Sequence, residues 1–178
     1  MNAIALKRNM HSALGQLTDG RLLRQFAYSD GRWTHAADGA SFEVRDPFSG
    51  EHLAHVASLG ADETTAAIDA AERALPAWKA LAPQERAARL RTWFELIKAA
   101  REDLALLMTL EQGKPLAESR GEIDYAASFV EWFAEEGKRL GAESPVSHLP
   151  GAQMLVTREP SGNCNATVCC AMRCVRCW

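Results

Sequence analysis

The stretch that decides the fold is Thr109-Leu110-Glu111-Gln112-Gly113-Lys114-Pro115-Leu116. It predicts the junction between two helices, because Gly113 can adopt the positive φ of a helix end and Pro115 cannot continue the preceding helix. Asp103 is suited to cap the start of that preceding helix. Its apolar face recurs at helical spacing at Leu104, Leu107 and Met108.

Three further segments also show the apolar periodicity of helices. The first starts near Asp62, a suitable N-cap, and is expected to kink or end near Pro76. The second starts at Pro83, because proline is favoured at the first helical position. The last runs from about Leu116 to Leu140 with an apolar side at Ile123, Ala127, Val130 and Ala134.

Short strands are predicted before these helices, over residues 22–58. Asp30-Gly31 favours a tight hairpin turn, and the turn from Asp46 to Gly50 leads into a strand near Leu53 to Ala57. The sequence therefore predicts a small antiparallel sheet. A further strand is expected after Pro150-Gly151, at Met154, Val156 and Arg158.

The composition is that of a soluble globular protein. Of the 178 residues, 47% are hydrophobic and 24% are charged, with a formal net charge of -3. The basic residues form no stripe that would neutralise phosphates, and no apolar run is long enough to span a bilayer. We therefore expect no nucleic acid or membrane partner and a cytoplasmic location. Lys7, Arg8 and His11 weakly suggest a mitochondrial leader, but an unstructured bacterial N-terminus is the preferred interpretation.

All five cysteines lie close together near the end of the sequence, at Cys164, Cys169, Cys170, Cys174 and Cys177. Their spacing is not that of ordinary zinc knuckles, and an odd number does not favour a disulfide framework. We interpret this segment as disordered and prone to oxidation. Zinc binding remains an alternative, and Cys164 as a catalytic nucleophile is disfavoured because no base or oxyanion group accompanies it.

Several segments together resemble the aldehyde dehydrogenase family. The helix junction at 109–116 is followed by Glu118, Gly121, Glu122 and Tyr125, as it is in that family. Gly31, Trp33, Asp46-Pro47 and Gly50-Glu51 resemble the family's opening hairpin and turn. The run 125–136 resembles the succinate-semialdehyde dehydrogenases, and Arg158-Glu159-Pro160 with Gly162 resembles the strand entry before the family's cofactor-binding turn.

The resemblance implies an α/β family fold that is incomplete here, with a small antiparallel hairpin region and several α-helices. We expect a disordered N-terminus over 1–20, the N-terminal part of the cofactor-binding and oligomerisation region over 21–162, and an aberrant cysteine-rich tail over 163–178. Because the missing central strands would normally cover them, the apolar stripes around Leu90, Phe94, Leu107 and Ile123 are expected to lie uncovered.

The family's functional motifs do not follow Gly162. The sequence continues Asn163-Cys164-Asn165-Ala166, and the chain has no Gly-x-Gly from which a dinucleotide cradle could be proposed. We therefore assign no catalytic, cofactor-binding or metal-binding residue. The family uses NAD or NADP, but neither is expected to bind this chain tightly. A frameshift near codon 162 would explain the loss of pattern, and the downstream nucleotide sequence tests it.

Other candidate residues have simpler interpretations. Gly113-Lys114 could be mistaken for a phosphate loop, but Pro115 occupies the Ser or Thr position. Phe129, Trp132 and Phe133 could line a substrate entrance, as the resemblance suggests, although core or subunit packing is preferred. Glu135-Glu136 could bind a cation or act as a base, but a solvated helix face is the default. His52 and His55 are expected on opposite faces of a strand.

Two functions remain open. The resemblance implies the NAD(P)-dependent oxidation of succinate semialdehyde to succinate for the family, with this chain inactive alone. The alternative is a non-catalytic subunit or interaction module that associates with itself or with a full-length dehydrogenase. A metal-binding adaptor that uses the cysteine-rich tail is a third and more remote hypothesis.

Overall fold

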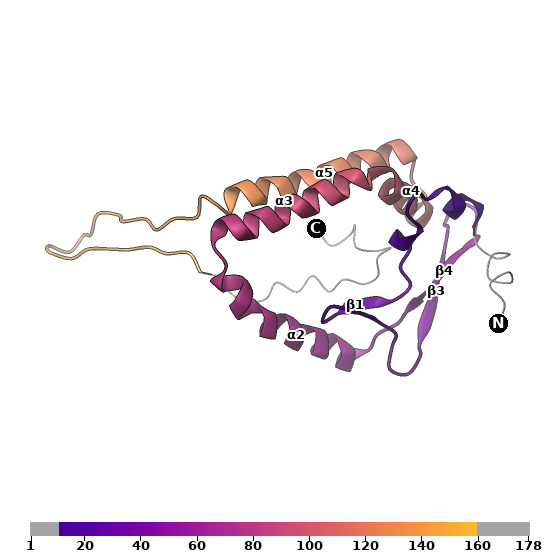
Figure 1. Ribbon diagram of the computed structural model, residues 1–178, viewed down its shortest axis with the longest axis horizontal. Helices are drawn as coiled ribbons and strands as arrows, with labels where there is room; N and C mark the ends of the chain where they lie inside the picture. Colours follow the sequence, from indigo (N-terminus) through magenta and orange to yellow (C-terminus); the bar gives the residue numbers. More distant parts are fainter. Residues whose placement is uncertain (1–10, 160–178) are drawn as a thin grey trace.

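The computed structural model describes residues 11–159. Within this range, two short helical turns and two antiparallel strand pairs precede four α-helices (Figure 1). The turns are η2 (Ser12–Gln16) and η3 (Gly20–Leu22). The strands are β1 (Ala27–Ser29), β2 (Arg32–Thr34), β3 (Ser41–Arg45) and β4 (His52–Ala57). The helices are α2 (Ala61–Ala80), α3 (Pro83–Ala99), α4 (Arg101–Gln112) and α5 (Leu116–Glu136).

The predicted hairpin at Asp30-Gly31 is confirmed. Both turn residues have positive φ, 50° at Asp30 and 77° at Gly31, which is the conformation that matches the right-handed twist of the strands. β1 and β2 pair around it, with Tyr28 opposite Trp33. β3 and β4 form a second antiparallel pair, so residues 11–159 contain two separate two-stranded sheets, whereas the sequence predicts one.

The helices α3, α4 and α5 pack on one another, and α4 also packs against the β3–β4 pair (Figure 1). The face of α5 that carries Ile123, Ala127, Val130 and Ala134 is buried, as its periodicity predicts. Leu107 and Ile123 are covered within this chain, and the expectation that they would lie uncovered is wrong, because Leu107 packs against η2 and β4 and Ile123 packs against α4. Leu90 and Phe94 on α3 are partly buried.

Two helices, α2 and α5, differ in their bounds from the predicted ones. α2 begins at Ala61 after Gly60, whose N–H donates to the Glu63 carboxylate at 2.9 Å, so Asp62 is not the cap. The same helix continues through Pro76 to Ala80, because a proline this close to the end removes few backbone hydrogen bonds. α5 ends at Glu136 rather than near Leu140.

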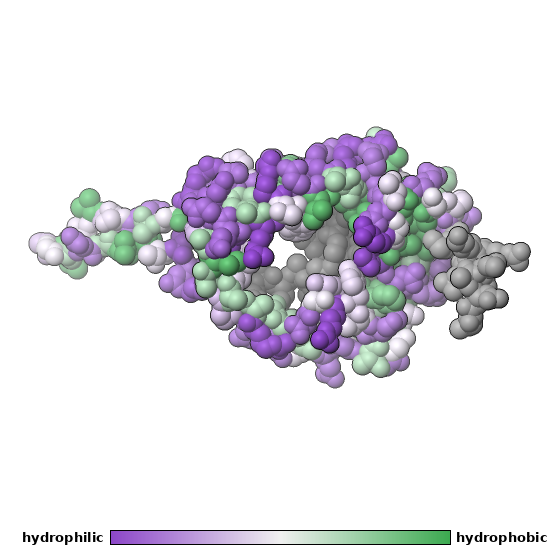
Figure 2. Space-filling view, in the orientation of Figure 1, coloured by the Kyte–Doolittle hydropathy of each residue, from purple (hydrophilic) through white to green (hydrophobic). Residues whose placement is uncertain are grey.

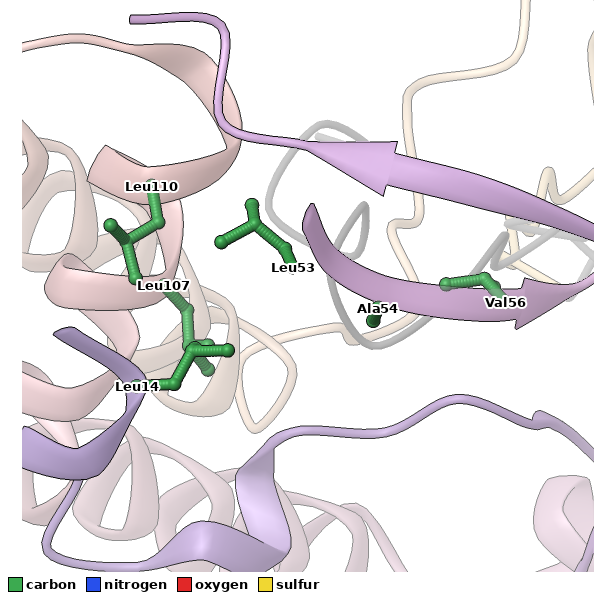
Figure 3. Close-up of a cluster of buried hydrophobic side chains, with 6 residues drawn as sticks. All are labelled: Leu14, Leu53, Ala54, Val56, Leu107 and Leu110. Atoms are coloured by element: carbon green, nitrogen blue, oxygen red, sulfur yellow. The ribbon is translucent and has the colours of Figure 1, made fainter. Parts of the chain in front are cut away.

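Residues 11–22, most of which belong to the segment predicted to be disordered, form η2 and η3 in the structure. Leu14 is 4% exposed and lies in a cluster with Leu53, Ala54, Val56, Leu107 and Leu110 (Figure 3). The cluster joins η2 to α4 and to β4. The apolar residues Leu14 and Leu17 were too few for a sequence pattern to indicate this packing.

A narrow extension leaves the body after α5 (Figure 1). Glu143 and Val156 form an isolated antiparallel bridge within it, and Arg158 pairs with Glu143 at 2.7 Å. The strand expected at 154–158 is thus reduced to one bridge. Among the described residues, no helix has the length and apolarity needed to cross a bilayer.

Candidate functional site

Among the described residues, an open groove lies between the β1–β2 hairpin and α2. It has a volume of about 390 Å³. Its floor consists of small apolar residues of α2, and its walls are the hairpin residues 27–31 and Leu59; the floor residues are Ala67, Ala70, Ala71 and Ala74. We call this feature the α2 groove.

The carboxylates at the edge of the α2 groove already have partners in the chain. Glu63 accepts hydrogen bonds from the backbone N–H groups of Ala37 and Gly60, both at 2.9 Å, and these hold its pKa below the usual range. Asp30 lies 3.7 Å from the Arg73 guanidinium. Both carboxylates are thus engaged by groups of the same chain, and the alanine floor gives the groove the character of a packing surface.

His52 and His55 lie on the same side of β4, contrary to the prediction. Val44 pairs with Ala54 and Arg45 pairs with His52, so Leu53 is an extra residue in the ladder, a β-bulge. The bulge shifts the alternation by one position and brings the two imidazole rings to 4.7 Å between centroids. Both Leu53 and Ala54 are buried as a result. Within residues 11–159, no group of three potential ligands could hold a metal ion.

The aromatic residues of α5 lie away from the core. Trp132 is 65% exposed and Phe133 is 56% exposed, whereas Phe129 is half-buried and stacks edge-on with Tyr125 at 4.8 Å. Packing in the core of this chain, one of the two preferred interpretations, is therefore wrong for Trp132 and Phe133. The α5 helix has two apolar faces, and only the one through Ile123 and Val130 is covered.

The charged residues that the sequence offered as candidates, Glu135, Glu136 and Lys114, all form ion pairs. Glu135 pairs with Lys138 at 2.6 Å, which holds the pKa of Glu135 below its usual range, and Glu136 pairs with Arg139 at 3.3 Å. A carboxylate that stays ionised in this way is a poor general base. Lys114 pairs with Glu122, and Gly113 ends α4 with φ 69°, so this segment is a helix stop.

Asp103 has a role that the sequence pattern did not indicate. It does not cap α4, whose N-cap is Ala100. Its buried carboxylate instead accepts the N–H of Thr18 at 2.9 Å and that of Asp19 at 2.8 Å. The two bonds attach the N-terminal segment to α4. A contact across more than eighty residues leaves no periodic signal in the sequence.

The described residues do not fit a dinucleotide cofactor. A cradle for its phosphates needs a glycine-rich turn between a strand and a helix. In residues 11–159 the glycines with positive φ lie in hairpin or loop turns and at the α4 stop; they are Gly31, Gly39, Gly50, Gly113 and Gly151. The sequence places every cysteine after residue 163, outside the described residues, so their predicted disorder and zinc binding remain predictions.

Comparisons with known proteins identify relatives of this chain. Residues 33–168 match the model of the aldehyde dehydrogenase family. Succinate-semialdehyde dehydrogenase [NADP(+)] of Escherichia coli is 53% identical over 147 residues, which cover 83% of this chain and 30% of that protein. A glutarate-semialdehyde dehydrogenase of Pseudomonas aeruginosa is 51% identical over the same length. The chain thus spans about 30% of the length of these curated relatives.

Solved structures agree with the sequence matches. The crystal structure of succinate-semialdehyde dehydrogenase from Burkholderia pseudomallei superposes with a TM-score of 0.79 at 50% identity, over 82% of this chain and 30% of that one. A point mutant of betaine aldehyde dehydrogenase from Staphylococcus aureus, solved with NAD+, superposes with a TM-score of 0.69 at 30% identity. The match covers 74% of this chain and 27% of that one. Most of this chain therefore shares its fold with these structures, and the chain belongs to the aldehyde dehydrogenase family.

Proposed function

We propose that this chain supplies the opening scaffold of an NAD(P)-dependent dehydrogenase for semialdehydes, and that the 178 residues alone do not oxidise an aldehyde. The observation that carries the proposal is the 53% identity to the Escherichia coli succinate-semialdehyde dehydrogenase, sustained over 147 residues. Relatives that act on glutarate semialdehyde and aspartate semialdehyde are 51% identical. Their substrates share an acid group beyond the aldehyde, so we propose the same chemical class here, with succinate semialdehyde as the first candidate.

The proposed inactivity rests on the chemistry of the described residues. Family turnover needs a thiolate nucleophile, a base for hydrolysis and a bound nicotinamide cofactor. Residues 11–159 contain no cysteine, and their carboxylates with depressed pKa values are engaged by N–H groups or by basic side chains. In this part of the chain, then, nothing is arranged to form or to hydrolyse a thioester.

A pair of measurements tests the proposal. The purified 178-residue chain is assayed for reduction of NAD and NADP with succinate semialdehyde, and we expect no turnover. A chimaera then joins residues 1–159 of this chain to the remaining part of the Escherichia coli enzyme, and we expect it to be active. Turnover by the chain alone, after removal of contaminating enzymes, would contradict the inactivity. A folded but inactive chimaera would contradict the scaffold role.

A second function, as a non-catalytic subunit, is favoured by the surface of the extension and of α5. In the extension Val146 is 97% exposed and Leu155 is 71% exposed, and Trp132 is similarly open on α5. Exposed apolar surface of this extent is typical of association sites. Co-purification of a tagged chain with a full-length dehydrogenase is the test. Recovery of the tagged chain alone, at matched expression, would exclude this second function.

A further inference from the structure

The β3–β4 pair carries a side-chain cluster unlike those on the helices. Figure 2 shows a hydrophilic surface over α3 and α5, where charged side chains such as Lys98 and Asp124 pair with one another. On β4 two imidazoles meet instead. The rings of His52 and His55 are 4.7 Å apart between centroids and inclined by 42°. Imidazole is the commonest metal ligand among protein side chains, so this contact is a candidate for chelation.

We propose that His52 and His55 together bind one divalent cation of the copper, nickel and zinc group, through one ring nitrogen of each. Imidazole suits these metals, whereas carboxylates suit magnesium and calcium. The site has two protein ligands, because residues 11–159 contain no group of three that could hold a metal ion. The inference does not depend on the proposed function, nor on the cysteines, which all lie after residue 163.

The separation of the two rings fits a shared metal. A metal–nitrogen bond is about 2.0 to 2.1 Å and an imidazole centroid lies about 1.1 Å behind its nitrogen, so each centroid is about 3.2 Å from the metal. At ligand angles from about 90° to about 109°, the square-planar and tetrahedral values, the two centroids are about 4.5 to 5.2 Å apart. The observed 4.7 Å lies within this range. His55 is exposed, so its ring can turn a nitrogen toward the metal without repacking the core.

A buried nitrogen of His52 supports its role as a ligand. The Nε2 atom of this ring is buried and has no hydrogen-bond partner among the described residues. Buried polar atoms without a partner are destabilising and uncommon in native proteins, and an ion that binds at the site is one explanation for them. A bond from this nitrogen to a metal replaces the hydrogen bond that the imidazole lacks.

The charges beside the histidine pair offset one another. In the β3–β4 ladder Glu43 lies opposite His55, and Arg45 lies opposite His52. The Glu43 carboxylate holds the Arg45 guanidinium at 2.7 Å, and Arg45 also donates to the Gly50 carbonyl at 2.8 Å. The positive charge of Arg45 opposes a cation at the histidines, and the carboxylate that it pairs with reduces this repulsion.

Calorimetric titration with Ni²⁺ tests the proposal. The full chain is prepared without a histidine tag, and its five cysteines are blocked with N-ethylmaleimide so that thiols do not bind the metal. We expect the parent chain to bind Ni²⁺, and His55→Ala to bind it at least about tenfold more weakly, because two linked ligands bind more tightly than one. Equal affinities of these two chains, or no binding by the parent chain, would overturn the proposal.

His148→Ala is the matched control. It removes an exposed histidine from the extension, away from β4, and should leave the affinity for Ni²⁺ unchanged. A loss in this variant as large as that in His55→Ala would assign the metal to scattered surface histidines and contradict the proposal.

A protection experiment on the parent chain replaces the titration if circular dichroism shows that His55→Ala is unfolded. Diethyl pyrocarbonate modifies free imidazole nitrogens, and trypsin releases residues 46–73, which contain His52 and His55 and no other histidine. At a Ni²⁺ concentration about ten times the dissociation constant, modification of this peptide should slow about tenfold, because about nine-tenths of the sites are occupied. The peptide 140–158, which contains His148, should react as before. Equal slowing of both peptides, or no slowing of 46–73, would contradict the proposal.

Discussion

At the scale of single residues, Asp103 connects the N-terminal segment to α4 through two backbone N–H groups. Replacing Asp103 with Ala leaves both donors without their acceptor. Each unsatisfied donor in a partly buried position costs on the order of 1 kcal/mol, so we expect Asp103→Ala to lower the free energy of unfolding by about 2 kcal/mol. Urea denaturation measures this loss. Limited trypsin digestion should show faster cleavage at Arg21 and Arg24.

Asp69→Ala is the control for this prediction. Asp69 is an exposed acid on α2, and its removal should change neither the unfolding midpoint nor the cleavage rate. An Asp103→Ala variant with unchanged cleavage would show that residues 11–22 are held by the Leu14 cluster alone. The sequence predicts that Asp103 caps α4, whereas its carboxylate accepts the N–H groups of Thr18 and Asp19. A cap is a local pattern that the sequence can indicate, and this contact joins residues far apart in the chain.

Gly113 is a residue whose role the sequence predicts well. Its φ of 69° and an ideal Cβ position only 2.9 Å from the Pro47 side chain both exclude a larger residue. We expect Gly113→Ala to destabilise the chain by about 1 to 3 kcal/mol, from backbone strain and from contact with the turn. Thermal unfolding followed by circular dichroism measures it.

Gly121→Ala is the opposite case within α5. Nothing lies within 4 Å of its added methyl group, and alanine is the better helix former. We expect a gain of about 0.5 to 1 kcal/mol. If Gly121→Ala destabilised the chain as much as Gly113→Ala, the positive φ and the Pro47 contact of Gly113 would not explain the loss at position 113.

At the scale of elements, Asp124 on α5 links two other helices. Its carboxylate pairs with Arg101 of α4 and with Lys98 of α3, each at 2.7 Å, and the Arg101 hydrogen bonds hold the pKa of Asp124 well below its usual range. A depressed pKa contributes stability above the unfolded value of 3.8, and that contribution is lost as pH falls below it. The pair is partly exposed, so we expect a contribution below about 1 kcal/mol.

Asp124→Asn tests this linkage. The variant should be less stable than the parent near neutral pH, and the difference should shrink as the pH falls below 3.8 and as salt rises. Urea denaturation over a pH series gives both curves. A stability difference independent of pH would show that the side-chain shape, and not its charge, matters at this position.

The sequence predicts whole elements better than their details. Asp30-Gly31 and Gly113 specify local backbone conformations, so the hairpin and the helix stop are found where expected. The bulge at Leu53 inserts one residue into a ladder without any glycine or proline to signal it, and it reversed the predicted relation of His52 and His55. Pro76 lies near the C-terminal end of α2, which ends at Ala80, and a proline so close to a helix end removes few backbone hydrogen bonds.

At the scale of the whole molecule, the family could be recognised from ordered motifs, whereas the burial of each helix depends on contacts that no motif encodes. Leu107 is covered by β4 and η2, and Ile123 is covered by α4, all of the same chain. Trp132 and Phe133 lie on the second apolar face of α5, which this chain leaves open. The periodicity of α5 identified the covered face. It could not show whether the aromatic face meets solvent or a neighbour.

This open face leads to a prediction about association. Replacing both Trp132 and Phe133 with Gln should leave the unfolding midpoint nearly unchanged, because both side chains are mostly exposed. It should reduce concentration-dependent association, as measured by sedimentation velocity, because exposed apolar patches drive contact between molecules. Val130→Ala, on the covered face, should do the reverse and cost about 1 to 3 kcal/mol with association unchanged or increased. If the double Gln variant unfolds as readily as Val130→Ala, the aromatic face is packed within the monomer, and α5 has two buried surfaces instead of one.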